Sequence, residues 1–185
     1  MGICALQRLE DGTLRNGILV ATVMSNGGLQ RAIEAAGGRM LRTPVGDRHV
    51  FEAMERADAG LGGEQSGHII FRDRATTGDG MLTAIELVKA VRAADAPPSE
   101  LAARIPRLPQ VMINSAVRHK DAWQVDPEFA AAVSRAEATL GTRGRILVRP
   151  SGTEPKLRIM VEGDQPDEIN RIAQQLDELA RARLN

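Results

Sequence analysis

Residues 146–161 read ILVRPSGTEPKLRIMV, and this stretch decides how the C-terminal part of the chain folds. Two short apolar runs, 146–148 and 157–161, stand on either side of turn-forming residues. Such runs, separated by a segment with Gly and Pro, predict two strands joined as a hairpin, here with a loop longer than the minimal turn. The stretch therefore predicts an antiparallel pair of strands with a polar loop at its tip.

The loop of this hairpin, residues 149–158, concentrates groups that bind anions. It holds two guanidinium groups, two hydroxyls, an ammonium group and a glycine. Arg offers a fork of donors that fits phosphate bidentately, and successive loop N–H groups can form an anion-binding nest. Pro, Ser, Gly and Thr are also ordinary turn residues, so a plain polar turn explains the composition equally well. The chemistry alone leaves both interpretations open.

Around the hairpin, the C-terminal part of the chain alternates strands and helices. A strand at 110–117, a helix at 126–140 and a final helix with an apolar face over 169–180 complete the pattern. Two helices and three strands predict a small two-layer α/β domain with an antiparallel sheet. Prolines between positions 97 and 109 interrupt the pattern and mark a domain boundary.

The part of the chain before these prolines has a different pattern. A near-continuous apolar run at 17–24 is typical of a strand buried on both faces, and a helix and a strand at 39–43 complete a β-α-β unit. Short strands near 59–62 and 69–71 extend the sheet. We expect a mixed-sheet α/β domain here. The helix at 80–94 is apolar around much of its circumference, which predicts that it is largely buried.

The composition excludes several classes of function. Apolar residues make up 43% and charged residues 26% of the chain, as in ordinary globular domains. Lys plus Arg and Asp plus Glu both number 24, so no overall positive field favours nucleic acid or an anionic membrane. Three Phe, one Trp and no Tyr leave few rings to stack on nucleic-acid bases. Because Cys4 is the only cysteine and neither a signal peptide nor an apolar run of roughly 20 residues occurs, we expect a cytoplasmic protein.

The segment 63–68, Gly-Glu-Gln-Ser-Gly-His, places a carboxylate, a hydroxyl and an imidazole on one tight turn. In an extended segment Glu64, Ser66 and His68 would face the same way, because strand side chains alternate. A carboxylate beside a hydroxyl suits the vicinal hydroxyls of a sugar, and an imidazole can move a proton near neutral pH. The alternative is a surface turn with a solvated Glu and a capping Ser. We favour the functional interpretation.

Other functional patterns are weak or absent. Ser66 stands one position off the Gly-x-Ser-x-Gly elbow, and neither a P-loop nor a complete dinucleotide fingerprint occurs. The three histidines lack metal-ligand spacing, so we expect no metal site in this chain. Arg48 stands at a predicted helix start, where it could contact an anion. Asp47 beside it is suited to be the N-cap of that helix.

Five motifs, in order, make the chain similar to the α-D-phosphohexomutase superfamily, and within it to the bacterial phosphoglucosamine mutases. They are VATVMSN at 20–26, TPVGDR at 43–48, GEQSGH at 63–68, TTGDG at 76–80 and RPSGTEP at 149–155. The resemblance implies that residues 1–16 end a preceding domain. It implies that 17–104 form the third domain of the family, which recognises the sugar, and that 105–185 form the fourth, which binds phosphate.

The resemblance also implies roles for particular residues. In the family the Gly-Glu-x-Ser-Gly-His loop binds sugar hydroxyls through its glutamate and serine, which here are Glu64 and Ser66. The histidine, here His68, lies close to the reacting sugar, where it can transfer a proton. The loop of the fourth domain holds the phosphate that is not transferred, and the residues that match this loop are Arg149, Ser151, Gly152, Thr153 and Arg158.

For activity, the resemblance implies interconversion of glucosamine 6-phosphate and glucosamine 1-phosphate through a phosphoserine enzyme and a sugar bisphosphate. The family's phosphoserine motif and its Asp-x-Asp-x-Asp magnesium loop do not occur in this sequence. We therefore expect the intact enzyme to need Mg²⁺, a sugar bisphosphate and preceding domains, and this chain to be inactive alone. A homodimer, phosphomannomutase or phosphoglucomutase specificity, and a non-catalytic phosphosugar-binding module stay open.

Overall fold

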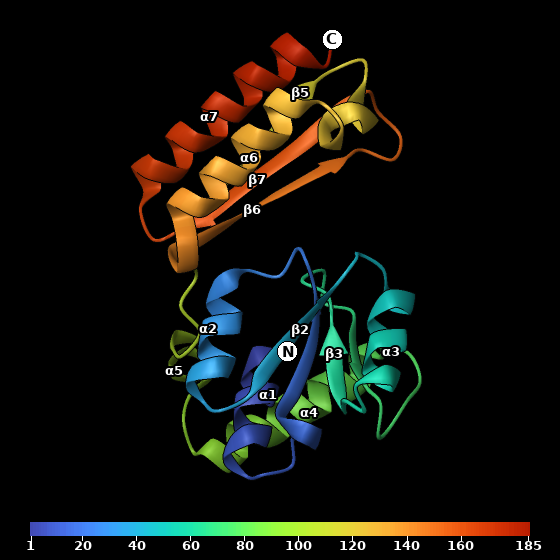
Figure 1. The fold of residues 1–185 in the computed structure, drawn as a ribbon. Coiled ribbons are helices and arrows are strands. Elements are labelled where there is room, and N and C mark those ends of the chain that lie inside the picture. The colour runs from blue at the N-terminus through green and yellow to red at the C-terminus, as the bar shows by residue number, and fades with distance from the viewer. The chain divides into compact units, whose positions relative to one another are not determined.

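The computed structural model describes all of residues 1–185 and divides them between Arg107 and Leu108 into two compact units, each of which is described by itself (Figure 1). The elements of the first unit are α1 (Gly2–Glu10), the 3-10 helix η1 (Arg15–Gly17), β1 (Ile18–Thr22), α2 (Gly27–Ala35), β2 (Arg39–Thr43), α3 (Asp47–Arg56), β3 (Leu61–Gly63), β4 (Ile69–Phe71), α4 (Gly80–Ala94) and α5 (Pro98–Ala103). Those of the second unit are β5 (Gln110–Ala116), η2 (Lys120–Gln124), α6 (Pro127–Leu140), η3 (Gly141–Arg143), β6 (Gly144–Pro150), β7 (Lys156–Gly163) and α7 (Pro166–Arg183).

The first unit is built on a four-stranded mixed sheet in the order β2-β1-β3-β4. Strand β1 is parallel to β2 and β3, and β4 is antiparallel to β3. Side chains of β1 alternate between two cores: Leu19 and Ala21 pack with residues of α1, α2 and α4, whereas Ile18 and Val20 pack with residues of α3. The sheet therefore lies between two helical layers, and the predicted mixed-sheet α/β fold is confirmed.

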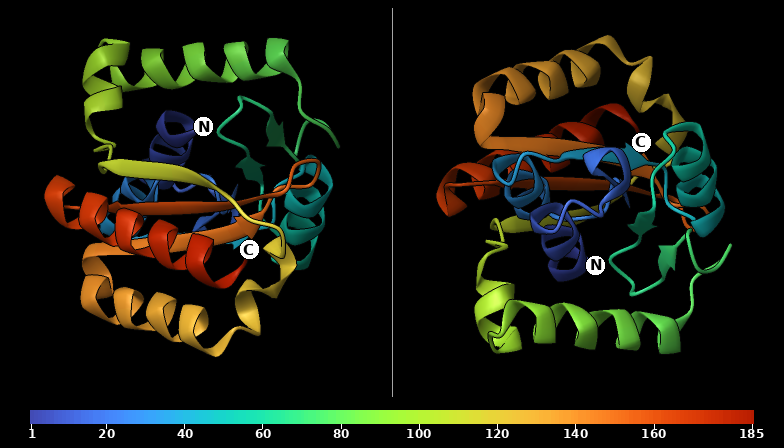
Figure 2. Two further views of the ribbon diagram at one scale, coloured as in Figure 1. Left: turned by 90° about the horizontal axis from the view of Figure 1, so that it is seen from above. Right: turned by 90° about the horizontal axis from the view of Figure 1, so that it is seen from below.

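The second unit has two layers. Its three-stranded antiparallel sheet has the order β5-β7-β6, and α6 and α7 pack side by side on one face of it (Figures 1 and 2). The core between the layers is aliphatic apart from Phe129 of α6, which is fully buried. This confirms the predicted smaller α/β domain. None of the helices in the whole chain is both long enough and apolar enough to span a membrane.

The prediction that α4 is largely buried is wrong. Glu86 and Ala90 are buried, but Met81, Ile85 and Val88 have exposed fractions of 79%, 51% and 58%. The helix packs mainly against α1 and thus uses only one side. The apolar residues around a helix show which side chains could be buried. The elements that pack against the helix determine which of them are buried.

The prediction that Asp47 is the N-cap of the helix after β2 is also wrong. Gly46 occupies the N-cap position, and Asp47 is the first helical residue, whose Oδ1 accepts the N–H of Arg48 at 2.8 Å. Gly46 has φ of +126°, a conformation that side chains rarely allow, so the sharp entry into α3 requires glycine there. In α4 and α6 the N-cap is an aspartate, Asp79 and Asp126, whose side chain accepts a main-chain N–H.

Candidate functional site

In the first unit, the predicted motifs meet at the carboxyl edge of the sheet. Because β1, β2 and β3 are parallel, the segments that follow them leave the sheet at the same edge (Figure 1). These segments are 23–26, 44–46 and 64–68. In open α/β sheets this edge is where ligands bind.

Glu64 links two of these segments. The N–H of Gly46 donates to Glu64 Oε1 at 3.0 Å, which ties the turn after β3 to the start of α3. Glu64 Oε2 makes no hydrogen bond, and the hydroxyl of the exposed Ser66 makes none either. One carboxylate oxygen and one hydroxyl are therefore left to contact a ligand.

The prediction that Glu64, Ser66 and His68 share one face of an extended segment is wrong. Residues 64–68 form the tight turn between β3 and β4, closed by the Glu64 N–H to His68 O bond at 2.9 Å and the Gly67 N–H to Glu64 O bond at 3.1 Å. Gly67 has φ of +97°. Strand alternation ends where the chain reverses, so the three residues share one turn rather than a common strand face.

His68 is held by segment 76–80, to whose residues the sequence analysis assigned no individual role. The N–H of Gly78 donates to His68 Nε2 at 3.2 Å, and Asp47 Oδ2 lies 3.6 Å from the same nitrogen. The bond from Gly78 needs an unprotonated Nε2, so the proton of the neutral ring is on Nδ1. A Cβ on Gly78 would lie 2.5 Å from Nε2, and glycine is therefore required for the ring to lie against this segment.

Arg48, predicted as an anion contact, is exposed and pairs along its own helix. Its Nε donates to Glu52 Oε1 at 2.8 Å, and this hydrogen bond raises the pKa of Arg48 and lowers that of Glu52. A role for Arg48 toward a ligand stays a prediction.

In the second unit, the predicted hairpin is β6 and β7, and its loop is 151–155. Arg149 and Arg158 lie directly opposite each other on the two strands. Burial and the neighbouring charge of Arg158 both lower the pKa of Arg149. Arg158 Nε is buried without a hydrogen-bond partner, and the carboxylate nearest to its guanidinium group, Glu154, lies 4.0 Å away. Like charges opposite each other destabilise a sheet. A bound anion would offset the repulsion between these two guanidinium groups.

The loop beside this arginine pair offers further unused donors. The hydroxyl of Ser151 is buried with no hydrogen-bond partner. The main-chain N–H groups of Gly152 and Thr153, both exposed residues, make no hydrogen bond. At the other end of the loop, Glu154 Oε1 accepts from Lys156 Nζ at 2.6 Å. The structure thus brings the five predicted phosphate-binding residues into one loop and the adjoining strand ends, where the Ser151 hydroxyl, Arg158 Nε and the N–H groups of Gly152 and Thr153 make no hydrogen bond.

Lys120 is a contributor to this region that the sequence analysis missed. Its Nζ donates to the main-chain oxygens of Ser151 and of Glu154, the latter at 3.3 Å. Lys120 lies in η2, 31 and 34 positions before these partners. No spacing rule links such distant positions, so only the fold reveals the contact.

No group of three or more His, Cys, Asp and Glu residues in the structure is arranged to hold a metal ion. The residues present therefore do not fit the magnesium site that the family resemblance implies for the intact enzyme.

Comparison with known proteins gives a consistent result for both units. A sequence model of phosphoglucomutase/phosphomannomutase, alpha/beta/alpha domain III, matches residues 1–108, and one of the phosphoglucomutase/phosphomannomutase C-terminal domain matches residues 112–179. The phosphoglucosamine mutase of Moorella thermoacetica is 51% identical over 97% of this chain and 40% of its own length. That of Nitratidesulfovibrio vulgaris is 47% identical over 100% of this chain and 41% of its own length. The chain thus spans about two fifths of the curated relatives it matches.

Among solved structures, N-acetylphosphoglucosamine mutase of Aspergillus fumigatus, in complex with GlcNAc-6P and magnesium, has a similar fold. It superimposes with a TM-score of 0.79 at 20% identity, over 100% of this chain and 43% of the other.

Proposed function

The chain belongs to the phosphoglucomutase/phosphomannomutase family, and we propose that it is the phosphosugar-recognition part of a phosphoglucosamine mutase. The proposal takes residues 17–104 as the third domain, 105–185 as the fourth and 1–16 as the end of a preceding domain. The identity of 51% and 47% to two phosphoglucosamine mutases favours glucosamine phosphates over other hexose phosphates. Phosphomannomutase or phosphoglucomutase specificity is the alternative that the experiment below distinguishes.

The observation that carries the proposal is the pairing of two like charges, Arg149 and Arg158, on adjacent strands. Two guanidinium groups on paired strands, with the nearest carboxylate 4.0 Å from Arg158, cost stability unless an anion joins them. The unpaired N–H groups of Gly152 and Thr153 and the buried Ser151 hydroxyl supply the remaining donors. A phosphate group, with three or four acceptor oxygens, is the anion that uses all of these donors.

The turn after β3 is proposed to take the sugar. Glu64 Oε2 accepts a hydrogen bond from a sugar hydroxyl, and the Ser66 hydroxyl is a second contact. His68 accepts the Gly78 N–H through Nε2, so Nδ1 is the ring nitrogen that faces no protein partner and is left to exchange a proton with a ligand. Turn and ring are both fixed by main-chain N–H groups, which keeps these groups in place before a ligand arrives.

The phosphoryl transfer itself is proposed to depend on domains outside this chain. In the proposal they supply the phosphoserine and bind Mg²⁺, which would neutralise charge on the transferred phosphoryl group. A sugar bisphosphate is the proposed intermediate. The isolated chain is therefore inactive, and turnover of glucosamine 6-phosphate by the purified 185-residue protein with Mg²⁺ and a sugar bisphosphate would contradict this.

Amide NMR titrations with glucosamine 6-phosphate, glucose 6-phosphate and inorganic phosphate test the recognition roles. We expect all three to shift Gly152 and Thr153, and only the sugars to shift Ser66 and His68. Tighter binding of glucosamine 6-phosphate than of glucose 6-phosphate supports the glucosamine assignment, and the reverse order supports the alternative specificity. Sugar titrations that leave Ser66 and His68 unmoved at saturation would remove the turn from the account.

A further inference from the structure

We propose that Lys120 is a positioning residue for the phosphate loop: it fixes the main chain of Ser151 and Glu154 so that loop N–H groups point toward the bound phosphate. The inference rests on the proposed function of the loop. It assigns to Lys120 a role through the backbone, with no contact to the ligand.

The contacts place Lys120 behind the loop. Nζ donates to the oxygens of Ser151 and Glu154, which lie near opposite ends of the turn. The side chain is half-buried. An ammonium group has three donors and no acceptor, so these two carbonyl groups are natural partners for it.

The planar peptide bond links the hydrogen bond at Ser151 O to the direction of the Gly152 N–H. The peptide that carries Ser151 O also carries the N–H of Gly152, and in a trans peptide the two point in opposite directions. With Ser151 O held on Lys120, the Gly152 N–H is directed to the other side of the loop. That N–H makes no hydrogen bond within the protein, so it is free to meet a phosphate oxygen.

The backbone just before Lys120 is anchored by two main-chain hydrogen bonds. The N–H of His119 donates to Leu184 O at 2.8 Å, and the N–H of Val117 donates to Pro155 O at 3.2 Å. The backbone around Lys120 is thus tied both to the end of α7 and to the loop. Because its backbone is held in this way, the Lys120 side chain can fix the loop, whose other main-chain bonds to neighbouring elements are Ser151 N–H to Lys156 O at 2.9 Å and the Val117 bond to Pro155.

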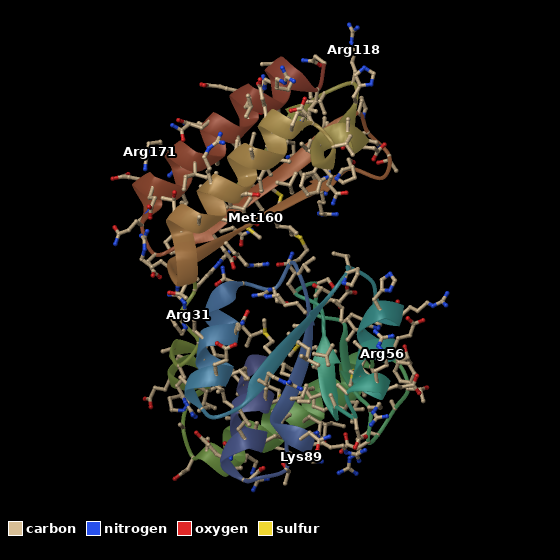
Figure 3. The ribbon with its side chains drawn as sticks, viewed as in Figure 1. Arg31, Arg56, Lys89, Arg118, Met160 and Arg171 are labelled. Carbon is tan, nitrogen blue, oxygen red and sulfur yellow. The ribbon has the colours of Figure 1, made fainter.

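The neighbouring Arg118 provides the matched control. It carries the same charge two positions earlier, but it is exposed, makes no hydrogen bond or ion pair, and extends away from the second unit (Figure 3). If Lys120 acted only as a positive charge that attracts phosphate, removing Arg118 would have a comparable effect, and salt would suppress both effects.

The experiment compares the full chain with Lys120→Met, Lys120→Arg and Arg118→Met. In the absence of ligand, we expect Lys120→Met to shift the Gly152 amide signal and Arg118→Met to leave it in place, with signals of β6 and β7 retained in both. Lys120→Arg keeps the donors and should keep the Gly152 signal closer to that of the unchanged protein. This readout needs no binding and remains decisive if Lys120→Met lowers overall stability.

Titration with inorganic phosphate completes the test. We expect Lys120→Met to weaken binding about tenfold at both low and high salt, the effect of losing a charged hydrogen bond, whereas Arg118→Met has a small effect that salt removes. An unmoved Gly152 signal in Lys120→Met, or equal salt-sensitive losses in Lys120→Met and Arg118→Met, would overturn the inference. Absence of phosphate binding by the unchanged chain would instead contradict the proposed function, while the ligand-free Gly152 signal still decides the role of Lys120.

Discussion

Arg149 and Arg158 lie directly opposite each other on β6 and β7, and burial together with the charge of Arg158 lowers the pKa of Arg149. Opposed like charges cost stability, and beside them lies a loop in which the N–H groups of Gly152 and Thr153 and the buried hydroxyl of Ser151 are unpaired. The fold thus keeps an electrostatically unfavourable arrangement that an anion would relieve. The strain and the proposed phosphate site are the same feature of the molecule.

We predict that Arg149→Ala separates stability from binding. Removal of one guanidinium group relieves the repulsion and should raise the free energy of unfolding by about 0.2–1 kcal/mol. The same change should weaken phosphate binding by about 1.5–3 kcal/mol through loss of charged hydrogen bonds. Urea unfolding and phosphate titration measure the two effects. A variant that loses stability while it keeps its phosphate affinity would show that the arginine pair is structural.

Gly78→Ala should displace the His68 imidazole. A Cβ at position 78 would lie 2.5–2.7 Å from three ring atoms of His68, so the ring must move and its bond to the Gly78 N–H is lost. We expect shifted ring signals of His68 in NMR spectra, loss of the sugar-induced change at this residue and an unchanged phosphate response at Gly152. The cost in stability should be about 1–3 kcal/mol.

Gly80→Ala is the control for that change. Nothing lies within 4 Å of a Cβ at position 80, which opens α4. Alanine is the better helix former, so the free energy of unfolding of this variant should be unchanged or should rise by up to about 1 kcal/mol. If both alanine variants left the His68 ring signals in place, the contact with Gly78 would not position the ring.

Arg145→Ala should strongly destabilise the second unit. Arg145 Nε donates to Glu162 Oε1 at 2.5 Å, and the Glu162 side chain is only 1% exposed. Removing the arginine takes away the ion pair that it makes with this buried carboxylate, which costs about 3 kcal/mol. Arg143→Ala, which breaks the more exposed pair with Glu168, should cost under about 1 kcal/mol. Thermal unfolding of the two variants compares them directly, and equal costs would contradict the argument from burial.

Glu86 predicts part of the response of the first unit to acid. Hydrogen bonds from Lys89 and then from Arg8 lower the pKa of Glu86 below its ordinary value of 4.5. A carboxyl whose folded pKa is lowered stabilises the fold above its ordinary pKa and loses that contribution as the pH falls toward the lowered value. Glu86→Gln should therefore be less stable than the unchanged chain near neutral pH. As the pH falls below about 5, it should lose less stability than the unchanged chain does. Parallel stability curves for the two proteins over that range would contradict the assignment.

The sequence predicted those features that local chemistry determines. The hairpin at 146–161 follows from apolar runs around a Gly- and Pro-containing loop, and β1 follows from its continuous apolar run. The candidate phosphate residues are neighbours in sequence, so the loop brings them together without help from the rest of the fold.

The sequence-based predictions were wrong or incomplete where packing between elements or a reversal of the chain determines the position of a side chain. The exposed face of α4 depends on what packs against it, and the reversal at Gly67 removes the strand alternation assumed for Glu64 and Ser66. Gly78 and Lys120 act through contacts between distant segments, 10 positions for Gly78 to His68 and 31 for Lys120 to Ser151. Periodicity and turn rules carry no information on such pairs.

The most direct test of the account is a titration of the full chain with inorganic phosphate, followed through the amide signals of Gly152 and Thr153 beside the same titration of Arg149→Ala. The account predicts saturable shifts of both signals in the unchanged chain and a much weaker response in the variant. Signals that stay in place up to high phosphate concentration, or that move equally in both proteins, would contradict the claim that this loop and its arginine pair bind phosphate.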